Sequence, residues 1–241
     1  MAWTRKAGQA WRCTLSRTTF EREIGRLEDR VLALGSLVER ALLDSARTLK
    51  YRDMKRGHRL IADDRVINRQ RHGIEQDVLA LIAMQQPMAG DLRVLAAILE
   101  IVTELERIGD YAKGVARINQ MIGEQALIRP LVDIPQMAEE AQEMLHEALD
   151  AFCRRDVELA RAIAERDQVV DGLYQRVYRA LIACVLNHPK QMEQVSYLLW
   201  AAHNYERAAD RVTNICERVI FAVTGQMVEL DAQEAGLEAV I

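Results

Sequence analysis

Two pairs of acidic side chains are the feature of this sequence that could do chemistry. Each pair belongs to the string Glu-Arg-x-x-Asp, which runs from Glu106 to Asp110 and again from Glu206 to Asp210. Residues four positions apart lie one above the other on a helix, with Cβ atoms about 5–6 Å apart. Carboxylates placed in this way supply oxygen ligands for metal cations and can bridge two metal ions. The repetition after 100 residues indicates that each half of the chain presents one such pair.

Further oxygen-bearing side chains precede each pair with the same four-residue spacing. They are Asp64 and Asn68 in the first half, and Asp167 and Asp171 at positions 103 residues later. If the helix that carries them packs beside the helix with the Glu-Arg-x-x-Asp string, two oxygen pairs converge on one surface. The candidate metal ligands are therefore Glu106, Asp110, Glu206, Asp210, Asp64, Asp167 and Asp171.

A solvated helix face is the simpler interpretation of these acids, and the residues alone leave it open. Lys113 and Arg117 continue the first acidic stripe and could neutralise it, whereas the second half has Thr213 at the position matching Lys113. Beyond the second pair, Asn214 and Glu217 are expected on the same face as Glu206 and Asp210, with His203 one turn before them.

A carboxylate-metal enzyme or a metal-storage protein built on a helical bundle is the competing hypothesis. A di-iron centre of the bundle type needs Glu-x-x-His on two helices. The chain has one such match, Glu143 to His146, and it has no second copy. A glycine-rich phosphate loop and a nucleophile elbow are also missing from the sequence. The motifs favour a protein that is not an enzyme.

The composition predicts an all-α protein. The 241 residues include only 4 prolines and 12 glycines, 5% are aromatic, and half are hydrophobic, a balance typical of long helices with a core. A net charge of −4 argues against a nucleic-acid partner. The four cysteines are far apart in sequence and form neither a disulfide framework nor a zinc knuckle, which favours a cytoplasmic protein. No apolar run reaches the ~18 residues of a membrane span.

Hydrophobic periodicity divides the chain into two similar halves. Asp53 and Asp156 are expected to cap helices, Gln86-Pro87 and His188-Pro189 to end them, and Gly225 to stop the last one. The segment from Ile128 to Pro135 is expected to be a non-helical connector. We therefore expect helices over about residues 20–51, 53–86, 90–122, 137–155, 156–187 and 191–224. The predicted fold is two tandem, structurally similar three-helix bundles of long antiparallel helices. The domain boundaries are a basic and disordered N-terminal extension (1–18), the first repeat (19–127), the second repeat (134–225) and a C-terminal tail (226–241).

Several strings carry a resemblance to a known family. The first half contains Gln85-Gln86-Pro87 followed by Asp91-Leu92-Arg93, and then Glu104-Leu105-Glu106-Arg107-Ile108-Gly109-Asp110. The second half contains Asp167-x-x-Val170-Asp171, and then Glu206-Arg207-x-x-Asp210 with Asn214 and Glu217. Over about residues 19–225 the chain resembles the PhoU-type phosphate-uptake regulators. It departs from their pattern at Ala208-Ala209, where Ile-Gly is usual, and in the basic segment 1–17.

The resemblance implies a role, partners and metals. It implies a negative regulator of phosphate uptake and of the phosphate-starvation response, with the family's PhoU-like architecture of tandem three-helix repeats. The implied partners are a phosphate ABC transporter and a phosphate-sensing histidine kinase, so that membrane contact is peripheral and made through partners, and the implied assembly is a homodimer. The implied cofactor is iron or zinc in multinuclear clusters, with no organic cofactor. Carried over by position, the ligands are Glu106, Asp110, Glu206 and Asp210, supported by Asp64, Asp167 and Asp171.

Overall fold

The computed structural model describes residues 17–123, 125–128 and 133–230. Within these ranges the chain is helical and contains no strand, which confirms the predicted all-α class. The elements are α1 (Arg17–Tyr51), α2 (Met54–Gln85), α3 (Gly90–Ile122), α4 (Asp133–Arg154), α5 (Val157–Glu165), α6 (Asp167–Asn187), the 3₁₀ helix η1 (Pro189–Gln191) and α7 (Met192–Thr224). The segment 1–18 was predicted to be disordered, and its residues 1–16 lie outside the described ranges. Residues 231–241 of the predicted C-terminal tail also lie outside them.

The predicted helix caps are present. Asp53 accepts a hydrogen bond from the backbone N–H of Arg56 at 2.9 Å, and Asp156 does the same for Leu159 at 3.0 Å. These contacts satisfy backbone donors that the first turn of a helix leaves free. At the end of α7, Gly225 adopts the left-handed conformation with φ 78° and donates to the Phe221 carbonyl, as expected for a glycine stop.

Two boundary predictions were wrong. The connector was expected to run through Pro135, but α4 already begins at Asp133 and holds this proline in its first turn, where a missing N–H costs nothing. The helix expected over 156–187 is divided into α5 and α6 at Arg166. There the Arg166 N–H bonds to the Ile163 carbonyl and the Val169 N–H bonds to the Arg166 carbonyl. These tighter three-residue bonds interrupt the α-helical ladder.

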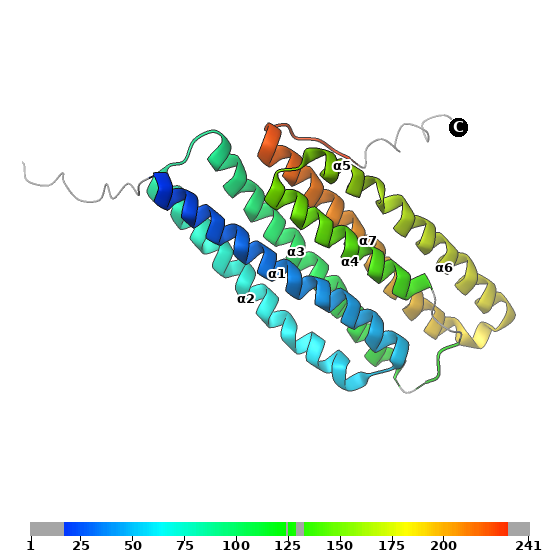
Figure 1. The fold of residues 1–241 in the computed structure, drawn as a ribbon. Helices are drawn as coiled ribbons and strands as arrows, with labels where there is room; N and C mark the ends of the chain where they lie inside the picture. Colours follow the sequence, from blue (N-terminus) through cyan, green and yellow to red (C-terminus); the bar gives the residue numbers. More distant parts are fainter. Residues whose placement is uncertain (1–16, 124, 129–132, 231–241) are drawn as a thin grey trace, which may run out of the picture.

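The two repeats share one hydrophobic core. Helices α1 and α3 of the first repeat pack against α4 and α7 of the second, while α2 covers α1 and α3, and α6 covers α4 and α7. Figure 1 shows α2 at one edge of the molecule and α6 at the other. The buried apolar side chains of both repeats form a single cluster. The duplicated unit is therefore stabilised across the repeat boundary, as well as within each repeat.

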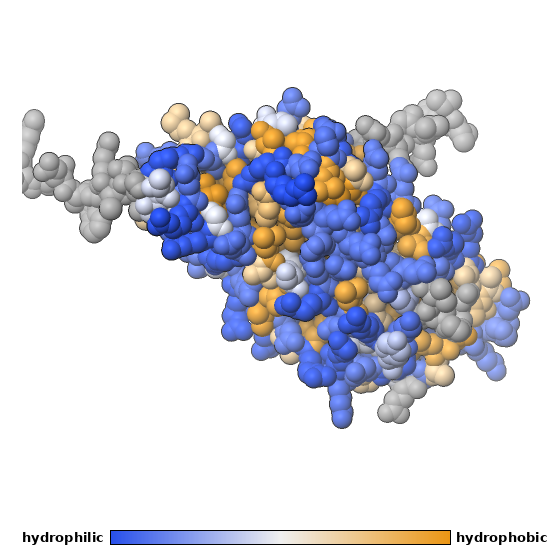
Figure 2. Space-filling view, viewed as in Figure 1, coloured by the Kyte–Doolittle hydropathy of each residue, from blue (hydrophilic) through white to orange (hydrophobic). Residues whose placement is uncertain are grey.

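Small and polar residues fix how the repeats meet. A Cβ atom at Gly35 of α1 would lie 2.1 Å from a Leu149 methyl group of α4, so any larger residue requires the Leu149 side chain to move. The fully buried Tyr205 of α7 places its hydroxyl 2.8 Å from Ser45 Oγ of α1. The face seen in Figure 2 is mostly polar, with apolar areas between the hydrophilic side chains. No helix in the described ranges combines the length and apolar content needed to cross a membrane.

Candidate functional site

The first acidic group lies between α2 and α3 and is joined by a lysine. Asp64 on α2 is only 8% exposed, and its Oδ2 lies 2.8 Å from Lys113 Nζ on α3. The same ammonium group also forms an ion pair with Asp110, and Asn68 donates to Asp64 Oδ2 at 3.1 Å. Lys113 therefore supplies the positive charge that these two carboxylates need.

Charge and partial burial shift the pKa values of Glu106 and Lys113 in this group. Partial burial and the repulsion of Asp110 raise the pKa of Glu106, while Arg71 and Lys113 oppose the shift. Burial alone would lower the pKa of Lys113, but its hydrogen bonds to Asp110 and Asp64 outweigh burial and raise it. The structure thus brings Asp64, Glu106 and Asp110 together as the sequence predicted, with a cation already in place.

The second acidic group lies between α6 and α7 and has no lysine. Burial and the neighbouring Asp210 raise the pKa of Glu206, and Asp171 of α6 adds to the shift. Burial also raises the pKa of Asp210, against the influence of nearby arginines and His203. Glu206 Oε2 is buried and lies 3.0 Å from His203 Nδ1, without the alignment of a hydrogen bond to any described residue. Asp167 stands one turn before Asp171, in the first turn of α6.

The two groups differ at the position that directly follows the acidic pair on the stripe. Where the first has Lys113, the second has the fully buried Thr213, whose Oγ1 makes no hydrogen bond within the described part of the chain. Arg207, which lies outside this stripe, forms an ion pair with the second acidic pair, with its Nε 3.5 Å from Asp210 Oδ2. The second pair therefore carries negative charge that its own stripe does not neutralise.

The fit to a metal ion differs accordingly between the halves. Among the described residues, no three His, Cys, Asp or Glu side chains are arranged as a ready ligand cluster. In the first half Lys113 joins Asp64 and Asp110, so these oxygens do not fit a metal ion as they lie. The second half fits better, because Glu206 and Asp210 are partly desolvated carboxylates without a lysine partner. Oxygen ligands of this type suit hard and borderline cations.

Asn214 and Glu217 have other partners than the second acidic pair. Asn214 Nδ2 lies 3.3 Å from Glu104 Oε2 on α3, and Glu217 Oε1 accepts the Leu230 N–H at 2.9 Å. These side chains help to hold α7 on α3 and the segment after α7 on the bundle. No signal in the sequence indicated the role of Glu104, because its partners Arg211 and Asn214 lie on α7, far away along the chain. The structure pairs Arg211 with Glu104 at 3.5 Å and Arg218 with Glu100 at 2.9 Å.

The lone Glu-x-x-His match does not belong to either acidic group. Glu143 is 61% exposed and pairs with Arg166 at 3.3 Å, and His146 is 70% exposed with Nδ1 3.3 Å from Glu39. Both side chains take part in surface contacts of α4. The sequence feature closest to a di-iron motif is therefore part of helix packing.

Comparison with known proteins identifies each repeat with a known domain. The PhoU domain model matches residues 31–118 and again 134–219, one match for each repeat. A Clostridium acetobutylicum protein called phosphate-specific transport system accessory protein PhoU homolog is 32% identical over 218 residues, which cover 90% of this chain and all of the relative. The PhoU of Escherichia coli K12, a phosphate-specific transport system accessory protein, is 32% identical over 207 residues, 86% of each chain.

Solved structures agree with the sequence comparison. The crystal structure of PhoU from Pseudomonas aeruginosa superposes with a TM-score of 0.81 at 34% identity, covering 86% of this chain and all of the other. The phosphate transport system regulatory protein PhoU from Streptococcus pneumoniae gives a TM-score of 0.81 at 28% identity, covering 87% and 99%. Both repeats match the PhoU domain model, relatives are about one third identical over most of the chain, and the fold is shared. This chain therefore belongs to the PhoU family.

Proposed function

We propose that this protein regulates phosphate uptake as an accessory component of a phosphate transport system, and that it acts by binding rather than by catalysis. The observation that carries the proposal is that relatives 32–34% identical over 86–90% of the chain are named as phosphate-specific transport system accessory proteins. In this proposal the protein is a negative regulator in the cytoplasm. It works as a homodimer that contacts a phosphate ABC transporter and a phosphate-sensing histidine kinase, and reaches the membrane only through them.

The second acidic group is the proposed metal site. Iron or zinc would be held by Glu206 and Asp210 of α7 together with Asp171 of α6, and would supply positive charge that joins the two helices. Support comes from the raised pKa values of Glu206 and Asp210 and from the acidic influence of Asp171 on Glu206. Metal at Asp64, Glu106 and Asp110 requires Lys113 to leave its two partners first.

A deletion strain tests the regulatory role. Without the gene, we expect phosphate-starvation genes to be expressed even when phosphate is abundant, because the negative regulator is missing. A plasmid copy of the wild-type gene should restore repression. Repression that is intact in the deletion strain, measured with a starvation-gene reporter and by phosphate uptake, would contradict the proposal.

A binding experiment tests the partners. The tagged full-length protein, incubated with solubilised membranes, should retain the transporter ATPase or permease subunits and the sensor kinase, identified by mass spectrometry. A tagged helical protein of similar charge serves as the control. Recovery of neither partner at high and at low phosphate would refute the proposed contacts.

Elemental analysis tests the metal site with a matched pair of variants. Protein purified without chelators should contain stoichiometric iron or zinc, which Glu206→Gln with Asp210→Asn should remove. The corresponding change in the first half, Glu106→Gln with Asp110→Asn, should leave that metal in place because Lys113 neutralises this group. Equal metal content in both variants would show that the second pair is not the ligand set.

A further inference from the structure

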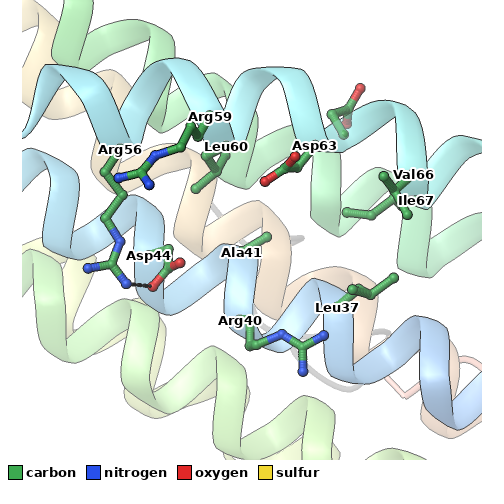
Figure 3. A pocket seen from close by; sticks show the side chains of 11 residues that line it. Leu37, Arg40, Ala41, Asp44, Arg56, Arg59, Leu60, Asp63, Val66 and Ile67 are labelled. Carbon is green, nitrogen blue, oxygen red and sulfur yellow. Dashed lines mark hydrogen bonds and ion pairs between the residues drawn. The ribbon is translucent and has the colours of Figure 1, made fainter.

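A pocket between α1 and α2 lies outside the acidic pairs of the candidate site. Its volume is about 540 Å³, within the range of about 300–1,000 Å³ typical of small-molecule sites. Leu37 and Ala41 of α1 and Leu60 and Ile67 of α2 form an apolar part of its wall. Figure 3 shows side chains of both helices turned toward the space between them. The pocket can therefore bury the apolar body of a ligand.

Arginines from both helices also line the pocket. Arg56 of α2 is held by Asp44 of α1, with Nη2 2.6 Å from Oδ1 (Figure 3). Arg40 of α1 and Arg59 of α2 also line the pocket, and neither forms an ion pair within the described ranges. Guanidinium groups bind carboxylate, sulfonate and phosphate groups with paired hydrogen bonds. Asp63 of α2 also lines the pocket and forms no ion pair within the described ranges, so these three side chains leave one net positive charge, which suits a ligand with one acidic group.

One buried polar atom of the wall is also unsatisfied. Asp64 lines the pocket and is 8% exposed; its Oδ2 accepts from Lys113, but its Oδ1 makes no hydrogen bond to a described residue. A buried acceptor without a donor is unfavourable by roughly 1–3 kcal/mol. A hydroxyl or amino group of a ligand would satisfy it.

We infer that this pocket binds a small organic anion, with its apolar body between α1 and α2, its acidic group at Arg40 and Arg59, and a donor group toward Asp64. The inference goes beyond the proposed regulatory role and does not depend on metal binding. Because Asp64 belongs both to the pocket wall and to the first acidic group, an occupied pocket lies in direct contact with the Asp64–Lys113–Asp110 link between α2 and α3.

Four probe compounds separate the contributions of the ligand. We expect the full-length protein to bind 4-aminonaphthalene-1-sulfonate with one site by isothermal titration calorimetry. Inorganic sulfate, which lacks the apolar body, and 1-aminonaphthalene, which lacks the anion, should each bind at least about tenfold more weakly. Naphthalene-1-sulfonate, which lacks the donor, should also bind more weakly. Sulfate binding as tightly as the full probe would overturn the apolar part of the site, and equal binding of the two sulfonates would overturn the role of Asp64.

Matched variants locate the site. Arg40→Glu with Arg59→Glu should weaken binding of the full probe by about 100-fold, or about tenfold for each guanidinium group lost. The control, Arg22→Glu with Arg65→Glu, makes the same charge change on the same two helices outside the pocket and should leave affinity unchanged. Ala41→Trp should abolish binding by filling the pocket, with circular dichroism reporting that the helices remain folded. No binding by the wild type, or equal losses in the pocket and control variants, would refute the inference.

Discussion

Replacing Lys113 by methionine tests how the first acidic group is stabilised. Methionine keeps much of the length and apolar character of the lysine side chain but removes the ammonium group. The substitution would leave Asp64 as a buried carboxylate without its cation, while Asn68 still donates to Asp64 Oδ2. We therefore expect the variant to fold and to be clearly less stable than the wild type.

The magnitude follows from the burial of the three side chains. Lys113 and Asp64 are 17% and 10% exposed at their side chains, so their contact is worth about 1.5–3 kcal/mol, as for hydrogen bonds to charged groups. Asp110 is 45% exposed, and its ion pair adds at most about 1 kcal/mol. The expected loss is about 2–3 kcal/mol. For a chain of this size, that corresponds to a fall in Tm of about 4–12 °C.

Urea unfolding at pH 7, monitored by circular dichroism, measures this loss of stability. A double-mutant cycle with Asp64→Asn identifies its cause. The raised pKa of Lys113 means that its stabilising contribution is fully present below its unfolded pKa and is lost only as pH rises through its higher folded value. In the Asp64→Asn background no buried carboxylate is left uncompensated, so Lys113→Met should cost less than about 1 kcal/mol there. Strictly additive effects of the two substitutions would refute the interpretation of Lys113 as the partner of Asp64.

Three further variants test other contacts. In metal-free protein, Glu206→Gln with Asp210→Asn should increase stability at pH 7 by about 0.5 kcal/mol, because it removes the repulsion between the two carboxylates. The raised pKa values of both acids favour folding below their unfolded pKa values, and this contribution is lost as pH rises through the folded ones. Urea unfolding across pH 4–8 in the presence of a chelator should therefore show a smaller decline in the variant. Tyr205→Phe should cost about 1 kcal/mol in the same assay, because it removes the buried hydrogen bond to Ser45. Arg166→Ala should lower the free energy of unfolding by about 1–2 kcal/mol and speed amide exchange at the α5–α6 break, because the side chain binds three glutamates of α4. For each of the three variants, an unchanged value would contradict the contact that it tests.

The features that sequence predicted well are local or repeated. The Asp53 and Asp156 caps, the Gly225 stop and the pairing of Glu106 with Asp110 each depend on residues within a few positions of one another. Helical periodicity also identified the two repeats, because the same apolar spacing recurs in both. Such features follow from backbone geometry, which the spacing of residues specifies directly.

The features that sequence missed depend on distant partners. The apolar pattern continues from Leu159 through Ile163 to Val170, so nothing local predicts the break at Arg166, which coincides with the ion pairs of its side chain to glutamates of α4. The single core shared by the two repeats and the pocket between α1 and α2 likewise arise from how helices pack. Pro135 was misjudged for a different reason, since a proline reads as a breaker unless its position in the first turn is known.

The two repeats differ in charge at the matched positions of Lys113 and Thr213. Both repeats keep a glutamate and an aspartate four residues apart on a central helix, and both place an acidic residue of the neighbouring helix beside them. In the first repeat the chain itself supplies the cation, which fixes α2 on α3. In the second repeat the matching side chain is a buried threonine, and the positive groups near the acidic pair are Arg207, Arg211 and His203, which lie on α7 with the pair itself. In the proposed function, the attachment of α6 to α7 is the one that responds to bound metal ions, whereas Lys113 links α2 to α3 without them.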